Sequence, residues 1–424
     1  MSGAATCSAS AARFANPWRV VAGAVAGLTV CNGPVLFFTS GVFLKPIAAD
    51  MHWQRSTVSF ALSLATFLSA LATPALGRMM DRYGIRAVSL PGIPVFAVSL
   101  AILALSPSSP AAFVVLAALA GVASTVQAPL PYAKAISAWF DDRRGLALGI
   151  AMAGVGLGAI LVPQITRALI DWVGWRGAYV GLGAVTLAVA FPAVALTIRE
   201  PDVRAGGEDA QARLRQGTGV TAREAARTSQ FWLMAAVFML AGAAINGANA
   251  HIVPLLTDRG LTPAAATGTF SVMGFSTLVG RPFIGVLLDR IFAPCVAAAF
   301  FMAPLAGLPL LAGGSGVSPV IGAALLGLAL GAEIDLIAFL TTRYLGQRAF
   351  GEIYGYLFTA FVLGSSVGQF IADLSYDRLG SYTPAMIGFA FALVAAALLV
   401  NRLGQYVYLP QLRIAPELVQ RPAE

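Results

Sequence analysis

The chain has 424 residues, of which 58% are apolar and 11% are charged, and its mean hydropathy is +0.80. An ordinary soluble domain carries roughly a quarter charged residues, so the composition excludes a soluble enzyme. The high apolar content excludes a disordered protein, and three scattered cysteines are too few for a disulfide scaffold. A protein that crosses the membrane several times remains.

Apolar segments recur along almost the whole chain. A membrane-spanning helix needs about 20 apolar residues, and this pattern predicts six spans before one long polar stretch and six after it. The first six are predicted at 18–44, 56–77, 87–106, 110–138, 145–170 and 177–198. The last six are predicted at 229–256, 264–287, 294–312, 318–342, 352–372 and 382–402. The expected fold is therefore an all-α membrane protein with twelve transmembrane helices in two pseudo-symmetric halves of six.

The polar stretch divides the chain into five parts. We expect an N-terminal tail at 1–17, a first six-helix bundle at 18–198, a central loop at 199–228, a second bundle at 229–402 and a C-terminal tail at 403–424. The first apolar run is longer than the apolar region of a cleavable signal peptide, so we expect it to stay as a membrane span.

Basic residues favour one side of the predicted membrane. Nineteen lie on the side of the N-terminus, and five lie opposite: Lys45, Arg55, Arg176, Arg259 and Arg378. Basic residues concentrate on the cytoplasmic side, so both termini and the central loop are predicted to be cytoplasmic, in a multi-pass protein of the cell (inner, cytoplasmic) membrane. Because this distribution accounts for the net charge of +8, nucleic-acid binding is not expected.

A short motif recurs in the two halves. The second predicted helix ends in Gly-x-x-x-Asp-Arg, from Gly77 to Arg82, and the eighth ends in the same pattern, from Gly285 to Arg290. Two halves in parallel repetition are typical of transporters.

The first of these motifs continues to Gly84 and Arg86, and the complete stretch resembles the signature of the major facilitator superfamily. In that family the aspartate and arginine of this turn belong to a cytoplasmic gate that stabilises the outward-open form. The resemblance implies a gate formed here by Gly77, Asp81, Arg82, Gly84, Arg86, Asp289 and Arg290.

Two further segments resemble the monocarboxylate transporters and the oxalate and formate exchangers. They are the stretch from Trp139 to Gly156 and the triplet Gly280-Arg281-Pro282. The resemblance implies an organic anion as cargo, with Arg281 as its binding residue. Phe38 and Phe361 stand where members of these groups carry a second cation, so a monocarboxylate fits better than a dianion.

Four ionisable residues fall inside predicted spans: Lys134, Arg281, Glu333 and Asp335. Each costs about 2.5–3.5 kcal/mol at the centre of a helix, so such residues line water, pair or bind a ligand. Arg281 can hold a carboxylate through two hydrogen bonds and keeps its charge. The alternative is an ion pair that only ties helices together.

Glu333 and Asp335 are two residues apart on one helix, so they point about 200° apart and cannot both face one cavity. We expect one of them to exchange a proton while Arg281 holds the substrate, and the pattern does not say which. His251, in the outer half of the seventh helix, is a further candidate for proton coupling or for sensing external pH. Ordinary hydrogen bonds between helices are the alternative for all three.

Neutral polar residues of the first, fourth and seventh helices are candidate secondary ligands, together with Lys134. They are Asn32, Tyr132, Asn246 and Asn249. Interhelical hydrogen bonding is the alternative role for them, and the Lys134 stem could instead reach the lipid headgroups. With two histidines and no ligand cluster, no metal site is expected, and we also expect no cofactor and a monomer.

The sequence thus predicts a secondary transporter that moves a small organic anion by alternating access, with protons and the lipid bilayer as its partners. The alternative is an exporter of a hydrophobic drug or secondary metabolite by proton antiport. An enzyme is not expected, because no nucleophile, base and orienting group come together in the sequence.

Overall fold

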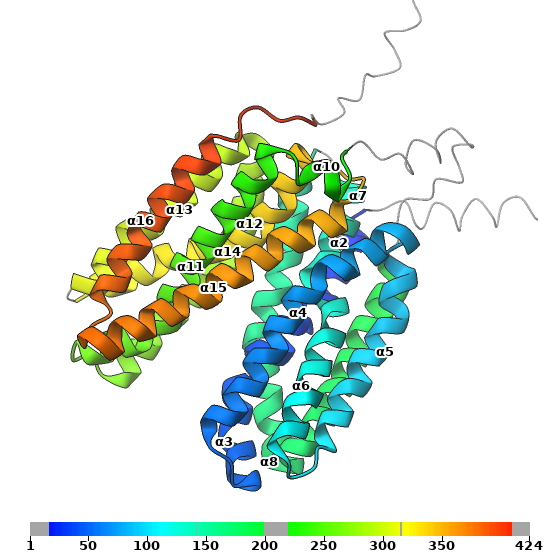
Figure 1. Ribbon diagram of the computed structural model, residues 1–424, viewed down its shortest axis with the longest axis vertical. Helices are drawn as coiled ribbons and strands as arrows, with labels where there is room; N and C mark the ends of the chain where they lie inside the picture. The colour runs from blue at the N-terminus through cyan, green and yellow to red at the C-terminus, as the bar shows by residue number, and fades with distance from the viewer. Residues whose placement is uncertain (1–16, 141, 199–218, 314–315, 409–424) are drawn as a thin grey trace, which may run out of the picture.

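The computed structural model describes residues 17–140, 142–198, 219–313 and 316–408, and almost all of them are helical (Figure 1). The first half contains α2 (Trp18–Thr29), η1 (Gly33–Phe37), α3 (Ser40–Met51), α4 (Arg55–Tyr83), α5 (Ile85–Ala104), α6 (Pro110–Ser124), η2 (Thr125–Gln127), α7 (Pro129–Trp139) and α8 (Arg144–Thr197). After the short α10 (Ala222–Ala225), the second half contains α11 (Ser229–Asp258), α12 (Pro263–Arg290), α13 (Ala293–Gly313), α14 (Ser318–Tyr344), α15 (Phe350–Leu379) and α16 (Thr383–Asn401).

The described helices confirm the expected fold class. Eleven of them are long and apolar enough to cross a membrane. One of these, α8, has 54 residues and is broken at Gly174, where φ is +73°, so it supplies two consecutive spans. A positive φ of this size is adopted readily by glycine. With this division, the described part of the chain contains the twelve expected spans.

The first span is longer than the predicted 18–44 and is not one regular helix. It runs from α2 through the π-helical turn η1 into α3, which ends at Met51. Pro34 lies in the first turn of η1, and because proline has no amide hydrogen it interrupts the helical hydrogen bonds at this point. The predicted tails at 1–16 and 409–424 and most of the central loop, 199–218, lie outside the described residues.

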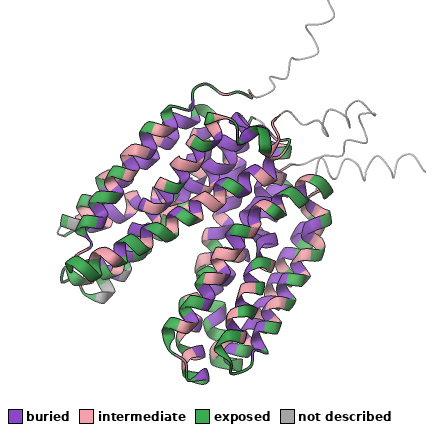
Figure 2. Cartoon of the chain, in the orientation of Figure 1, coloured by how far each residue is buried: buried purple, intermediate pink, exposed green. Residues whose placement is uncertain are grey.

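The two halves form separate bundles that meet at one end and diverge at the other (Figure 1). They meet where α7 and α10 lie, which we call the closed end, and diverge where α3 lies, which we call the open end. The main contacts between bundles are α4 with α15 and α8 with α12. Buried residues gather where the bundles meet (Figure 2).

Glycines allow the bundles to touch at the closed end. A Cβ on Gly77 of α4 would lie 2.0 Å from the carbonyl oxygen of Gly351 on α15. In the same way, a Cβ on Gly285 of α12 would lie 2.3 Å from the carbonyl oxygen of Gly145 on α8. Both distances are far below van der Waals contact, so the two helix crossings require residues without a side chain. The repeated motif glycine thus has the same packing role in both halves.

The repeated aspartates bind helix N-termini of the opposite half. Asp81 accepts hydrogen bonds from the backbone N–H groups of Gly351 and Glu352, both at 3.0 Å. Asp289 accepts them from Gly145 and Leu146, at 2.7 and 2.9 Å. The first N–H groups of a helix have no partner within the helix and carry partial positive charge. Each carboxylate therefore satisfies two such groups across the boundary between bundles.

Further polar contacts join the bundles at the closed end. The Arg78 guanidinium pairs with the Glu352 carboxylate. Arg144 donates from Nη1 to Thr342 Oγ1 at 2.9 Å. Gln347 donates from Nε2 to the carbonyl oxygen of Ser137, also at 2.9 Å.

The other residues of the motif take different positions. Gly84 has a φ of +88° and forms the turn between α4 and α5. Arg82 is exposed and its guanidinium lies over the ring of its neighbour Tyr83. Arg86 is half-buried in the first turn of α5, and Arg290 is exposed at the end of α12. The three arginines are thus arranged around the closed end, whereas the aspartates make its inter-bundle bonds.

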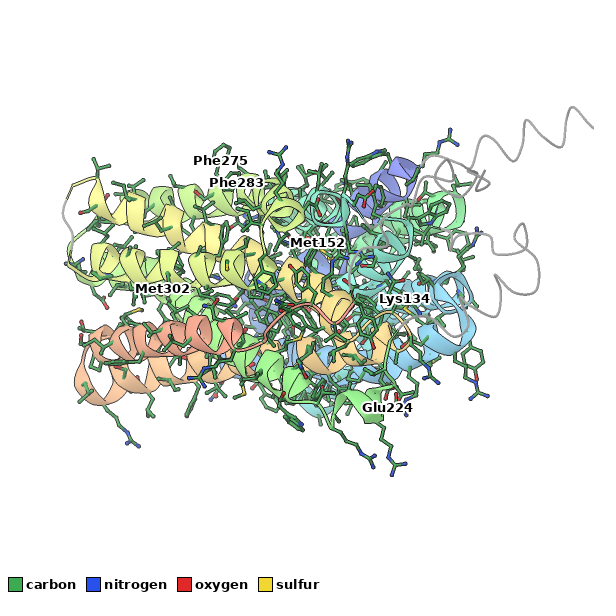
Figure 3. All side chains as sticks on the ribbon, turned by 90° about the horizontal axis from the view of Figure 1, so that it is seen from above. Lys134, Met152, Glu224, Phe275, Phe283 and Met302 are labelled. Carbon is green, nitrogen blue, oxygen red and sulfur yellow. The ribbon has the colours of Figure 1, made fainter. Side chains whose placement is uncertain are left out.

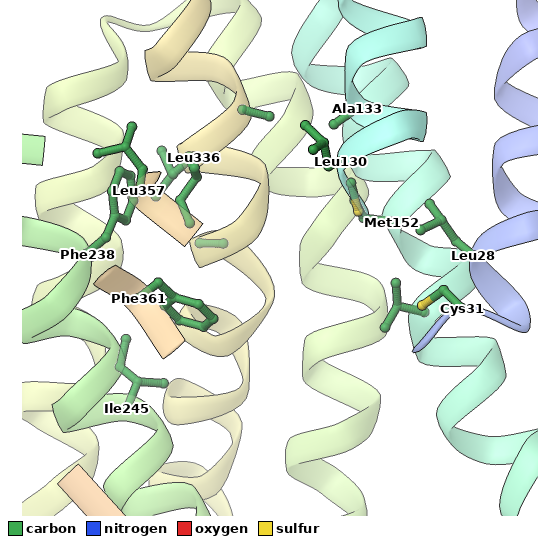
Figure 4. Close-up of a cluster of buried hydrophobic side chains, with 14 of the residues drawn as sticks. Leu28, Cys31, Leu130, Ala133, Met152, Phe238, Ile245, Leu336, Leu357 and Phe361 are labelled. Atoms are coloured by element: carbon green, nitrogen blue, oxygen red, sulfur yellow. The ribbon is translucent and has the colours of Figure 1, made fainter. Parts of the chain in front are cut away.

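Apolar side chains fill the interior of each half. Figure 4 shows one group in the first half and one in the second. They include Leu28, Leu130, Met152, Phe238, Leu336 and Leu357, all nearly inaccessible to solvent. By contrast, Phe275 and Phe283 of α12 lie on the outer surface (Figure 3), where the membrane would cover them.

Replacing Gly285 with alanine is expected to force the closed end apart, because the new Cβ would overlap the Gly145 carbonyl. The matched control is Gly274→Ala on the same helix, where a Cβ meets no atom within 4 Å. Spin labels on the exposed residues Tyr83 and Ile291, one in each half, report the separation. We expect a longer mean distance in Gly285→Ala alone; an unchanged distance would contradict this packing role.

Replacing Asp81 with asparagine is expected to lower stability by about 1.5–3 kcal/mol. The change weakens the bonds to α15 and leaves Lys134, whose Nζ lies 2.7 Å from Asp81 Oδ1, without its counter-charge. Adding Lys134→Met removes that second penalty, so the double variant should melt at a higher temperature than Asp81→Asn alone. Melting in detergent measures this, and equal melting temperatures for the two variants would argue against the coupling.

Candidate functional site

A cavity of about 570 Å³ lies between the two bundles. Its walls come from α2–η1–α3, α4 and α6 in the first half and from α11 and α15 in the second. The polar side chains along it include Asn32, Ser69, Ser124, Asn246, Gln369 and Asp373. Because the bundles are joined at the closed end, this cavity lies on the side where they diverge.

The wall from the first half is neutral and hydrogen-bonded. Asn32 donates from Nδ2 to Ser69 Oγ at 3.2 Å, and Ser124 donates to the same oxygen at 3.1 Å. These residues come from three different spans, so the cluster fixes the relative positions of α2, α4 and α6. Asn32 therefore lies at the cavity, as the sequence predicted, but one of its amide hydrogens is used within the wall.

In the second half, a residue of the cavity wall is hydrogen-bonded to a buried acid. Asn246 of α11 lines the cavity and donates from Nδ2 to Glu333 Oε2 of α14 at 3.1 Å. Glu333 itself is 1% exposed, and its second oxygen, Oε1, has no hydrogen-bond partner. A single amide thus separates this carboxyl group from the cavity.

Arg281 and Asp335 form a second buried pair nearby. Arg281 Nη1 on α12 lies 3.7 Å from Asp335 Oδ1 on α14, and the two residues are 5% and 0% exposed. This distance is within range of an ion pair but too long for a hydrogen bond. Arg281 Nε and Nη1 and both Asp335 oxygens have no hydrogen-bond partner.

Small residues bring two neighbouring helices against Arg281. A Cβ on Gly149 of α8 would lie 2.3 Å from the Arg281 carbonyl oxygen, and a Cβ on Gly331 of α14 would lie 3.3 Å from Arg281 Cγ. Because α8 belongs to the first half and α12 to the second, Arg281 lies at the boundary between the bundles. A movement of one bundle against the other therefore changes its surroundings directly.

This arrangement can bind an anion. Leaving a buried donor or acceptor without a partner costs about 1–3 kcal/mol, and more for a charged group. A carboxylate that accepts hydrogen bonds from Arg281 would satisfy donors that Asp335 does not reach. Glu333 and Asp335 contact different helices, α11 and α12 respectively, as their spacing of two residues predicts.

His251 lies near the open end and is also buried. Its Nδ1 is 2.9 Å from the carbonyl oxygen of Gly247, and its Nε2 is 2.8 Å from Asp373 Oδ1 on α15. Asp373 lines the cavity, with a side chain that is 63% exposed. The histidine is therefore connected to the cavity through this carboxylate.

Of the predicted substrate ligands, Asn32 and Asn246 line the cavity, whereas Arg281, Lys134, Tyr132 and Asn249 do not. Lys134 pairs with Asp81 at the closed end in this form and is absent from the cavity lining. Tyr132 is completely buried within the first half and donates to Gln127 Oε1 at 2.7 Å. Asn249 is absent from the cavity lining, and its Oδ1 has no hydrogen-bond partner.

Sequence reasoning missed the polar face of α15. Ser365, Gln369 and Asp373 are spaced four residues apart and all line the cavity. This spacing puts them on one face of a helix, so the signal was present in the sequence. This polar face was not predicted because Asp373 lies next to the predicted end of the span, and charged residues are common at span ends.

Comparisons with known proteins agree with this architecture. The family model of the Major Facilitator Superfamily matches residues 25–369. An uncharacterized 38 kDa protein of Thermoproteus tenax is 26% identical over 404 residues, which cover 93% of this chain and 98% of that protein. Monocarboxylate transporter 11 of Mus musculus is 26% identical over 418 residues, which cover 94% of this chain and 88% of that protein.

The fold is also similar to a solved structure. A crystal structure of the fucose:proton symporter FucP of E. coli superposes with a TM-score of 0.71 at 13% identity, covering 92% of this chain and 99% of that one. This likeness supports the fold alone. The family model, in contrast, matches well over half of the residues, so the chain belongs to the Major Facilitator Superfamily and is a membrane transporter.

Proposed function

We propose that the protein carries a small organic anion, most suitably a monocarboxylate, and that Arg281 binds the carboxylate. The observation that carries the proposal is the incomplete Arg281–Asp335 pair, in which a permanent cation with free donors is buried between the bundles. The similarity to a monocarboxylate transporter over most of the chain supports the same class of substrate.

Charge balance within the buried cluster favours coupling to a proton. Asp335 is the described carboxylate within ion-pair range of Arg281. If a substrate carboxylate takes that place, Asp335 becomes a second, uncompensated anion in a site that excludes water, which is strongly unfavourable. Protonation of Asp335 removes the excess charge, so we infer that one proton enters with one anion. Glu333, bonded to Asn246 on the cavity wall, is suited to pass that proton.

The bundles would then alternate around this site. The bonds of Asp81 and Asp289 keep the closed end shut in the form described here. We infer that they break when the open end closes, so that Arg281 becomes accessible from the other side. In this proposal Asp81, Asp289 and the surrounding motif are the gate.

The orientation belongs to the same proposal. Arg78, Arg144 and Arg290 lie at the closed end, together with the described ends next to both tails. Basic residues favour the cytoplasmic side, so we infer that the closed end is cytoplasmic and that this form faces outward.

Arg281→Gln is expected to strongly reduce saturable uptake of monocarboxylates into proteoliposomes. Loss of a charge-assisted hydrogen bond of about 1.5–3 kcal/mol corresponds to a reduction of roughly tenfold or more. Arg167→Gln is the matched control, because Arg167 is an exposed surface residue that pairs with Asp171. Normal uptake by Arg281→Gln, or no carboxylate uptake by the unmodified chain, would contradict the proposal and favour the exporter of hydrophobic compounds.

Asp335→Asn is expected to uncouple transport from protons. The asparagine is neutral at every pH, so it imitates the protonated acid and needs no proton when the anion binds. Exchange of labelled for unlabelled monocarboxylate should continue, whereas stimulation of uptake by an inward proton gradient should be lost. Gradient-stimulated uptake by Asp335→Asn, measured beside the unmodified chain, would show that another group carries the proton.

A further inference from the structure

His251 is held between two hydrogen-bond acceptors. Nδ1 faces the carbonyl oxygen of Gly247, which can only accept, so Nδ1 must carry a hydrogen. Nε2 faces the Asp373 carboxylate, which also accepts when ionised. A neutral imidazole has one N–H and cannot serve both partners. The geometry therefore requires one additional proton shared between His251 and Asp373.

The groups around this pair are mostly acidic. The His251 ring lies 5.1 Å from the ring of Tyr382, at the start of α16, and Tyr382 stacks on Tyr376 of α15. Three carboxylates lie close enough to Tyr382 to act on it electrostatically: Asp258 of α11 and Asp373 and Asp377 of α15.

The described basic residues at the open ends of α11 and α15 are directed elsewhere. Arg259 donates to the carbonyl oxygen of Leu311. Arg378 lines an apolar groove formed by α11, α15 and α16, away from the cavity. Within the described part of the chain, the ion-pair partner of Asp373 is His251. The compensating positive charge of Asp373 is therefore the extra proton on its own pair.

We propose that His251 and Asp373 form a protonatable charge filter on the cavity wall near the open end. With the shared proton bound, the pair is neutral overall and an anion can pass. Without it, Asp373 leaves an uncompensated negative charge on the cavity wall and repels anions. The proposed filter is separate from the Arg281 site. Its effect on cargo rests on the proposed function, whereas the charge of the pair does not.

The charge can be measured without any substrate. Gln369 lines the cavity one helical turn from Asp373, so Gln369→Cys places a thiol about 6 Å from the filter. In a chain with Cys7→Ser, Cys31→Ala and Cys295→Ser, the thiol is labelled in detergent by a negative and a positive methanethiosulfonate of similar size. The ratio of the two rates cancels the intrinsic effect of pH on the thiol.

In the otherwise unmodified protein, the rate ratio of negative to positive reagent should fall as the pH rises from about 5 to about 8. A unit charge at this distance in water changes each rate about threefold and hence the ratio about tenfold. Asp373→Asn should raise the ratio at every pH, because only His251 remains and it can add only positive charge. His251→Gln should give a low ratio that does not change with pH. The double variant should restore the high ratio, because neither charge remains.

Two results would overturn the proposal. One is a ratio that does not depend on pH in the unmodified chain. The other is a ratio at about pH 8 that Asp373→Asn does not raise. If His251→Gln does not fold, Asp373→Asn alone decides, because removing the carboxylate must raise the ratio at about pH 8. Since the assay uses no cargo, its result is independent of whether the chain carries a carboxylate.

Discussion

Two carboxylates bound to helix N-termini across the bundle boundary determine the shape of this transporter. Asp81 binds the start of α15 and Asp289 the start of α8, and each bond pair depends on a glycine crossing beside it. Such bonds require the helix ends to meet within about 3 Å. In this form they hold the bundles together at one end, while the bundles diverge at the other end around the cavity.

The crossing of α8 and α12 also places Arg281 at the boundary between the bundles. Arg281 is on α12, whose backbone is pressed against Gly149 of α8 near the closed end. A buried cation there is tolerable only while a carboxylate compensates it. Asp335 does so at 3.7 Å, without a hydrogen bond. In the proposed mechanism the pair persists when no anion is bound, and a substrate carboxylate replaces the acid because no hydrogen bond holds it. We regard this looseness as the physical basis of the proposed coupling.

Much of the fold was predictable from the sequence, because apolar length and the repeated Gly-x-x-x-Asp-Arg pattern are local signals. The repeated pattern alone indicates Asp81 and Asp289 as candidate gate residues. The partners themselves were not predictable, since the N-termini of α15 and α8 carry no distinctive side chain and contribute backbone N–H groups. The partner of Lys134 was not predictable for a related reason. A lysine two turns from a helix end has no local feature that distinguishes a cavity ligand from a partner of Asp81 on another helix. The pairing of His251 with Asp373, between residues far apart in the chain, was likewise beyond any spacing rule.

The most direct test of the central claim is the number of protons taken up when an anion binds. A pH-indicator dye in weakly buffered detergent solution can follow this while a monocarboxylate is titrated into the purified protein. The account predicts close to one proton taken up for each anion bound. Saturable binding with no proton uptake would contradict the exchange of a substrate carboxylate for Asp335 at Arg281.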